Sequence, residues 1–190
     1  MISARGVFTA TNHPDVAPRR VLIDTTLVVE AMIADQPGQM EAAAILDNLA
    51  ASGAEIVFNR LMEIEMLQAA SYVAGRHAPG NRRAGLRDGR VRRRSRRMAI
   101  DLRSTWHDFL DRVTWQRIEL EVVTDAVHEV MFGTGLSSYD AVHAATAIAA
   151  DCDAIATLDS DFGRLPAAQV GTIITTPHRL ARTRRLRATT

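Results

Sequence analysis

The stretch RVLIDTTLVVEAMIAD, residues 20–35, decides the fold of this chain. Its first half, RVLIDTT, is a run of apolar and β-branched residues that predicts a short buried strand ending at Asp24. Its second half, TLVVEAMIAD, has the apolar spacing of a helix that ends before the turn QPG at residues 36–38. The chain is therefore expected to open as a strand followed by a helix, with an aspartate at the junction.

Strand-like and helix-like patterns continue to alternate after this opening. Three segments follow directly: a helix QMEAAAILDNLAASG (39–53), a strand AEIVFN (54–59), and a helix RLMEIEMLQAASYVAG (60–75) that Asn59 can cap. The next stretch, Arg82 to Val113, has a helical pattern with an apolar stripe only in its second half, so its first half is predicted to be an exposed arm or loop.

The C-terminal third repeats the alternation. Its predicted elements are the strand RIELEVV (117–123), a short helix DAVHEVMFG (125–133), a longer helix SSYDAVHAATAIAAD (137–151), and the strands DAIATLD (153–159) and VGTIITTP (170–177). Ser137 or Ser138 can cap the longer helix. Strands that alternate with helices predict an α/β fold with right-handed crossovers, a mainly parallel sheet and helices on both faces.

Length and composition favour a single globular domain. The chain has 190 residues, 47% of them apolar, and no apolar run approaches the roughly 20 residues needed to cross a bilayer. The N-terminus lacks the pattern of an export signal, so a cytoplasmic protein that does not contact a membrane is expected. The single cysteine, Cys152, is interpreted as a buried apolar residue.

Arginine is unevenly distributed, although the net charge is only +1. Nine arginines lie between Arg82 and Arg97, five more lie between Arg179 and Arg187, and the chain has no lysine. This distribution divides the chain into a polar leader (1–19), a domain (20–178) with an Arg-rich insertion at about 79–97, and a basic tail (179–190).

Six carboxylates share one feature: each lies at or just after the end of a predicted strand, or in the first turns of a predicted helix. They are Asp24, Glu63, Glu65, Asp140, Asp159 and Asp161. Because ligands of an open parallel sheet bind at the carboxyl ends of its strands, these side chains are expected to converge on one cavity.

Such a cluster needs compensation, because two like charges about 4 Å apart repel by roughly 4 kcal/mol at an effective dielectric near 20. Either the pKa values rise and protons are shared, or a divalent cation binds. Carboxylate oxygens suit Mg²⁺ or Mn²⁺. One or two such ions activate water for attack on a phosphodiester, so the cluster predicts nuclease chemistry.

Taken singly, these residues also admit structural interpretations. Asp24 could cap a turn or helix, Asp140 could interact with a helix dipole, and Glu63 and Glu65 could be surface charges. His143 lies three residues after Asp140 on the same helix face, where packing or a hydrogen bond to Asp140 is favoured over general-base catalysis.

Several enzyme classes lack support. Ser138, Asp140 and His143 lie within about 1.5 helical turns and cannot form a serine triad. The chain has no GxxxxGK[ST] or GxGxxG motif for nucleotide binding. A phosphatase-type fold centred on Asp24 would need a second aspartate two residues later, where this chain has Thr26.

Four segments together resemble the PIN-domain nucleases, and most closely the VapC-type toxins of bacterial toxin–antitoxin pairs. They are VLIDTT (21–26), NRLMEIEML (59–67), LSSYDAVHAATAIA (136–149) and IATLDSDF (155–162). The most specific part is the pair SSYDAVHAATA and TLDSDF, in which Asp159 follows Asp140 at a spacing of nineteen positions. The resemblance covers the chain from about Val21 to Pro177.

The resemblance implies a three-layer α/β/α sandwich and a Mg²⁺- or Mn²⁺-dependent endoribonuclease that acts on structured RNA such as tRNA or rRNA. It also implies a cognate antitoxin as partner and a homodimer. Its acidic site corresponds to Asp24, one glutamate, Asp140 and Asp159, with Asp161 as a candidate fifth acid.

Roles within this implied site can be assigned to individual residues. Asp24, Asp140 and Asp159 are expected to bind the metal, and Glu65 to position or deprotonate water. Glu65 is preferred to Glu63 because it lies six residues after Asn59 and precedes an apolar residue, as the family's glutamate does. Two hydroxyl side chains beside the aspartates are expected to hydrogen-bond the carboxylates, those of Thr25 and Thr157.

The Arg-rich insertion exceeds what small family members carry, so the resemblance does not explain it. Its arginines are candidates for RNA phosphate contacts: Arg92, Arg93, Arg94, Arg96 and Arg97. A solvated charge run and a surface for an acidic antitoxin segment are the alternatives. For the whole chain, the rival hypotheses are a PIN-like nuclease acting on DNA or in RNA processing, and a non-catalytic Arg-rich module that binds nucleic acid or a partner.

Overall fold

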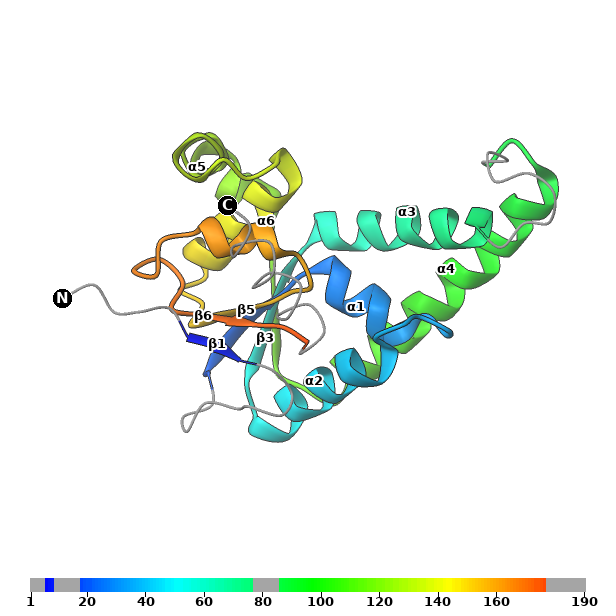
Figure 1. The fold of residues 1–190 in the computed structure, drawn as a ribbon, viewed down its shortest axis with the longest axis horizontal. Helices are drawn as coiled ribbons and strands as arrows, with labels where there is room; N and C mark the ends of the chain where they lie inside the picture. Colours follow the sequence, from blue (N-terminus) through cyan, green and yellow to red (C-terminus); the bar gives the residue numbers. More distant parts are fainter. Residues whose placement is uncertain (1–5, 9–17, 77–85, 177–190) are drawn as a thin grey trace, which may run out of the picture.

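The structure is a computed structural model that describes residues 6–8, 18–76 and 86–176 (Figure 1). In these ranges one sheet of six parallel strands forms the centre, in the order β1-β6-β5-β2-β3-β4. The strands are β1 (Gly6–Phe8), β2 (Arg20–Ile23), β3 (Glu55–Asn59), β4 (Trp115–Ile118), β5 (Ala154–Ala156) and β6 (Thr172–Ile174). The predicted parallel α/β fold is confirmed.

Alternation along the strands divides the core into two layers. Val21 and Ile23 of β2 point into one apolar cluster and Leu22 into the other. In the same way, β3 turns Ile56 and Phe58 to one side and Val57 to the other. Because the strands are apolar on both sides, helices must cover both faces of the sheet.

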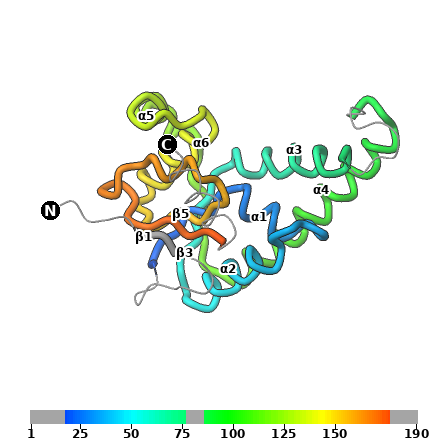
Figure 2. Tube along the Cα trace, viewed as in Figure 1, coloured from blue at the N-terminus to red at the C-terminus, as the bar shows by residue number. Residues whose placement is uncertain are grey.

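Helices cover the two faces unequally (Figures 1 and 2). Four helices share a core with one face: α1 (Thr25–Met32), α2 (Gln39–Ser52), α3 (Arg60–Arg76) and α4 (Gly89–Leu110). Two helices pack on the other: α5 (Leu120–Thr134) and α6 (Ser138–Ala149). A short 3₁₀ helix, η1 (Ser160–Arg164), follows β5. This is the predicted three-layer α/β/α sandwich.

The Arg-rich segment differs from its prediction as an exposed arm or loop. Residues 89–97 form the first turns of α4, a helix of 22 residues that begins at Gly89. Its N-cap is Asp88, whose carboxylate accepts from the backbone N–H groups of Arg90 and Val91. α4 packs against α3, and the pair runs out from the sheet as a hairpin (Figure 1). The sequence pattern concealed this because only Val91 and Ser95 are buried there.

The predicted strand RIELEVV is wrong in its second half. The strand β4 ends at Ile118, and residues 120–123 already belong to α5. Within α5, Val123 and Val130 are buried and Val127 is partly buried, which is a helical spacing that overrides the short alternation.

The N-terminal leader contributes a strand that its polar sequence did not predict. Gly6–Phe8 form β1, which pairs with β6 at the edge of the sheet. Leader residues 1–5 and 9–17, insertion residues 79–85 and the basic tail 179–190 lie outside the described residues. In the described part of the chain, no helix is long and apolar enough to span a membrane.

Candidate active site

Sheet order places the predicted acids at one edge. β2 lies between β5 and β3, with Ile23 opposite Ala156 and Leu22 opposite Val57. The backbone N–H of Asp24 donates to the carbonyl of Ala156 over 3.0 Å, so β2 and β5 remain paired up to the aspartate. The segments after these three strands therefore start side by side.

Asp24 is buried at the start of α1 and acts as its N-cap. Its Oδ2 accepts hydrogen bonds from the hydroxyls of Thr26 and of Thr157, the latter over 2.8 Å. The hydrogen bonds described for this carboxylate are thus all accepted by Oδ2. The second oxygen, Oδ1, lies 3.9 Å from Nε2 of His143. The capping interpretation of Asp24 is thus correct, and it leaves one carboxylate oxygen for another ligand.

Asp159 follows β5 and is linked to Asp24 through Thr157. The Asp159 N–H donates to the Thr157 hydroxyl over 2.9 Å, and the Asp159 carboxylate accepts from the Asp161 N–H over 2.8 Å. Asp161 itself forms an ion pair with Arg164 at 3.1 Å. Its charge is therefore partly compensated within η1, unlike that of Asp159.

The two glutamates of α3 lie in different surroundings. Glu65 Oε2 accepts from the Thr25 hydroxyl and lies 2.8 Å from Nε2 of His143. Glu63 instead lines a separate groove between α3 and α4, beside Arg103. Residues two apart on a helix point in different directions, so only Glu65 joins the group around Asp24.

His143 does not pair with Asp140, contrary to one of its predicted roles. The imidazole is only 1% exposed and bridges Glu65 and Asn59, whose side-chain nitrogen lies 3.3 Å from Nδ1. Burial disfavours a charged imidazole, but the hydrogen bond to Glu65 and the nearby negative charges raise the pKa of His143. Asp140 bonds to Ser137 instead, whose hydroxyl donates to it over 2.6 Å.

The carboxylates influence one another electrostatically. Burial raises the pKa of Asp140, and the charges of Asp159 and Asp24 raise it further, while the Ser137 hydrogen bond acts in the opposite direction. Burial also opposes ionisation of Glu65, but hydrogen bonds from His143 and Thr25 outweigh it, so the pKa of Glu65 is lowered. This edge of the sheet thus combines an ionised glutamate, which His143 and Thr25 hold by hydrogen bonds, with aspartates that repel one another.

The sequence pattern missed Thr26 and Thr146 as polar contributors, and it predicted Asn59 only as a helix cap, which is confirmed by the Met62 N–H that donates to Asn59 Oδ1 over 3.2 Å. Thr26 donates to Asp24 and accepts from the N–H of Leu158, which ties α1 to the segment after β5. Asn59 and Thr146 are buried and hydrogen-bonded to each other over 2.8 Å behind His143. A polar residue within an otherwise apolar helix, as at Thr146, is the signal that could have indicated this network.

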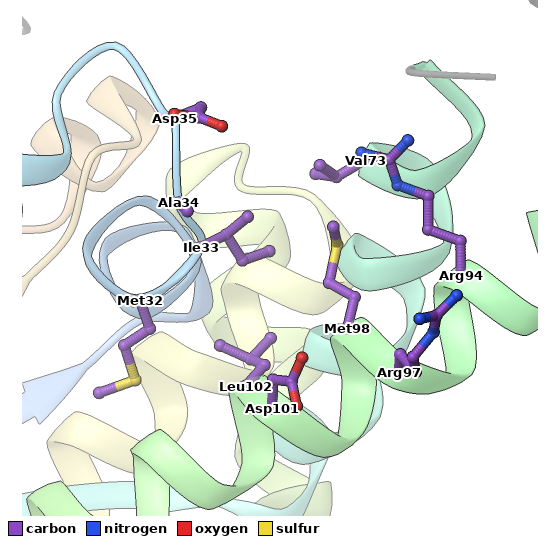
Figure 3. Close-up of a pocket in the computed structure, with 10 residues that line it drawn as sticks. All are labelled: Met32, Ile33, Ala34, Asp35, Val73, Arg94, Arg97, Met98, Asp101 and Leu102. Carbon is purple, nitrogen blue, oxygen red and sulfur yellow. The ribbon is translucent and has the colours of Figure 1, made fainter. Parts of the chain in front are cut away.

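The predicted RNA-binding arginines fall into two groups on α4. Arg94 and Arg97 line a cavity of about 410 Å³ between α4, α3 and the end of α1. Figure 3 shows their guanidinium groups on one side, Asp35 across from them, and Met98 and Leu102 near the floor. The others, Arg92, Arg93 and Arg96, are exposed and do not line it. None of the site acids lines this cavity either.

A parallel α/β/α domain with one buried and three half-buried acids, Asp24 and then Glu65, Asp140 and Asp159, at the carboxyl edge of its central strands defines a class of fold and site. Residues 21–168 match the PIN domain family, so this chain belongs to that family. Membership supports assignment to the nuclease class of hydrolases.

Comparison with solved structures agrees on the fold. The crystal structure of FitAcB from Neisseria gonorrhoeae has a TM-score of 0.50 to this chain at 15% identity, covering 80% of this chain and 96% of that one. At this identity the likeness concerns the fold. No curated protein matches the chain.

Proposed function

We propose that this protein is a metal-dependent endoribonuclease whose site is formed by Asp24, Glu65, Asp140 and Asp159. The observation that carries the proposal is the crowding of negative charge at this edge: burial raises the pKa of Asp140, and repulsion by the charges of Asp159 and Asp24 raises it further. A divalent cation relieves such repulsion, and protonation is the alternative.

The donor chemistry fits Mg²⁺ or Mn²⁺. The three aspartates offer only carboxylate oxygens, which hard divalent cations prefer. As positioned, no three Cys, His, Asp or Glu side chains of the described ranges meet closely enough to enclose an ion. Asp24, Asp140 and Asp159 would therefore hold an ion partly through water or substrate oxygens, as Mg²⁺ sites commonly do. When bound, the ion would activate water and stabilise the leaving oxygen.

Glu65 is proposed to orient water and accept its proton. His143 and Thr25 both contact Oε2, which leaves Oε1 for a further partner. Its lowered pKa keeps the carboxylate ionised, as a proton acceptor must be. Thr26 and Thr157 meanwhile fix the orientation of Asp24.

Replacing Asp140 tests the acidic site directly. Asp140→Asn keeps an acceptor for Ser137 but removes the charge, and should abolish Mg²⁺-dependent cleavage of bulk tRNA. Asp125→Asn on the exposed surface of α5 is the matched control and should cleave as the parent does. If Asp140→Asn cleaves as fast as the control, the acidic-site hypothesis is wrong.

RNA is the proposed substrate because exposed arginines Arg92, Arg93 and Arg96 lie on α4, whose partner α3 carries Glu65. Such arginines supply phosphate contacts, while the acids act on one bond. Parallel assays with tRNA, rRNA and single- and double-stranded DNA separate this proposal from a DNA nuclease. Binding that survives Asp140→Asn without any cleavage by the parent would favour the non-catalytic module.

We further propose that the protein is the toxin of a toxin–antitoxin pair and forms a homodimer. The cavity lined by Arg94 and Arg97, and also by Asp35 and Asp101, is proposed to receive a segment with charged and apolar side chains, which an antitoxin could supply. Exposed Phe132 on α5 and Tyr139 on α6 offer apolar surface for a second copy. Growth arrest on expression, its relief by a neighbouring small gene product, and light scattering of the purified protein test these points.

A further inference from the structure

A buried chain of polar groups connects Glu65 to the interior of the domain. It runs from the carbonyl of Val142 through Thr146, Asn59 and His143 to Glu65. Asn59, His143 and Thr146 are each no more than 1% exposed, so each polar atom must find its partner within the protein.

The first hydrogen bonds in this series of polar groups determine which atoms are donors and which are acceptors. The Thr146 hydroxyl donates to the carbonyl of Val142 over 2.8 Å, so its oxygen can accept from the Asn59 amide at 2.8 Å. At the other end of that amide, Oδ1 of Asn59 accepts from the N–H of Met62 over 3.2 Å as the cap of α3. If the Asn59 amide were flipped, its NH₂ group would face the N–H of Met62, and two donors would oppose each other. The side-chain nitrogen of Asn59 must therefore face His143.

The orientation of Asn59 determines the tautomer of His143. Nδ2 of Asn59 lies 3.3 Å from Nδ1 of the imidazole and can only donate, so Nδ1 must accept. The single ring proton then resides on Nε2, which donates to Oε2 of Glu65 over 2.8 Å. A second proton on Nδ1 would oppose the amide hydrogens, even though the surrounding carboxylates attract positive charge.

We infer that His143 is a positioning residue, held by Asn59 as the Nε2–H tautomer so that it donates to Glu65 and leaves Oε1 of Glu65 for the reaction. His143 therefore acts neither as a general base nor as a metal ligand. The inference deepens the proposed function, because it assigns how the glutamate of that site is held.

The tautomer can be read by heteronuclear NMR of the imidazole nitrogens, independently of cleavage. At a pH above the raised pKa of His143, where the parent's imidazole carries one proton, the His143 signals, assigned by their loss in His143→Gln, should show a protonated Nε2 and an unprotonated Nδ1. Asn59→Asp keeps the helix cap but presents an acceptor to Nδ1, so Nδ1 should gain a proton. A protonated Nδ1 in this one-proton form of the parent would overturn the inference.

Activity then separates positioning from simple support of the fold. His143→Gln places an amide donor near the Nε2 position and should stay within about tenfold of the parent, whereas His143→Leu should lose about 10–100-fold in kcat with little change in KM. Thermal unfolding identifies any variant that fails to fold. Equal kcat for His143→Leu and the parent would contradict the inference. Absence of cleavage by the parent, with the NMR result as expected, would refute the proposed nuclease and leave the tautomer standing.

Discussion

Thr157 donates a hydrogen bond to Asp24 over 2.8 Å, although 133 residues separate them in the chain. The contact joins the ends of β5 and β2, the two strands that meet at the acidic edge. The same hydroxyl oxygen accepts from the N–H of Asp159. One buried threonine thus sets the orientation of one aspartate and the backbone position of another.

Removing that hydroxyl should affect both stability and cleavage. Thr157→Val leaves the half-buried Asp159 N–H and one oxygen of the buried Asp24 without this partner, which should cost about 1–3 kcal/mol in the free energy of unfolding. Nuclease activity should fall about 10–100-fold because the aspartates lose a group that orients them. Denaturant titration and cleavage assays measure the two effects. Thr157→Ser keeps the hydroxyl and should resemble the parent in both.

Asp140→Asn should stabilise the protein when no divalent ion is present. The pKa of Asp140 is raised in the folded state, so its stabilising contribution is present at low pH and is lost as the pH rises through the folded-state pKa. At neutral pH the charge is therefore unfavourable, and its removal should raise the Tm by at most about 2 °C, since solvent screens a half-buried group.

Divalent ions should reverse the order of thermal stability, so that the parent has a higher Tm than Asp140→Asn. Mg²⁺ or Mn²⁺ that binds only the folded state stabilises it by mass action, so the parent should gain Tm on titration and Asp140→Asn should gain much less. Differential scanning fluorimetry with and without a chelator measures both. An identical metal response in parent and variant would exclude Asp140 as a ligand, and Asp125→Asn controls for general charge removal.

Exposed arginines of α4 should set the salt dependence of RNA binding. If Arg93 contacts a phosphate, Arg93→Gln should weaken binding and reduce the slope of log K against log salt by about 0.7–0.9. Arg112→Gln removes the same charge from an exposed residue paired with Asp47 and should leave the slope unchanged. Fluorescence anisotropy with labelled tRNA over a salt series checks this. Equal slopes for all three proteins would leave α4 without a role in phosphate binding.

Cys152 should be unreactive in the folded protein. Burial raises the pKa of its thiol to about 12, so almost no thiolate exists at neutral pH. Because it is the single cysteine of the chain, a chromogenic thiol reagent should report one site that reacts only when denaturant unfolds the protein. Rapid reaction without denaturant would contradict this prediction, because it would show that the Cys152 thiol is accessible to the reagent in the folded protein.

The sequence predicted best where local signals and burial agree. RVLIDTT, AEIVFN and the capped helix from Ser137 were correctly placed, because each combines an apolar run with a residue that ends or caps it. The first turns of α4 and of α5 were misread for the opposite reason. Their burial is set by packing against α3 and α6, which no local pattern reveals.

By itself, the sequence determined the parallel α/β class, the family, and the set of acids from which the site is chosen. The tertiary structure decided which of them lie together: it placed Glu65, rather than Glu63, beside Thr25, and it placed His143 against Glu65 rather than Asp140. The physical reason is that strand order and helix rotation determine which side chains meet. A buried polar atom forms hydrogen bonds with the groups that the fold brings within about 3 Å of it, and these need not be its neighbours in the sequence.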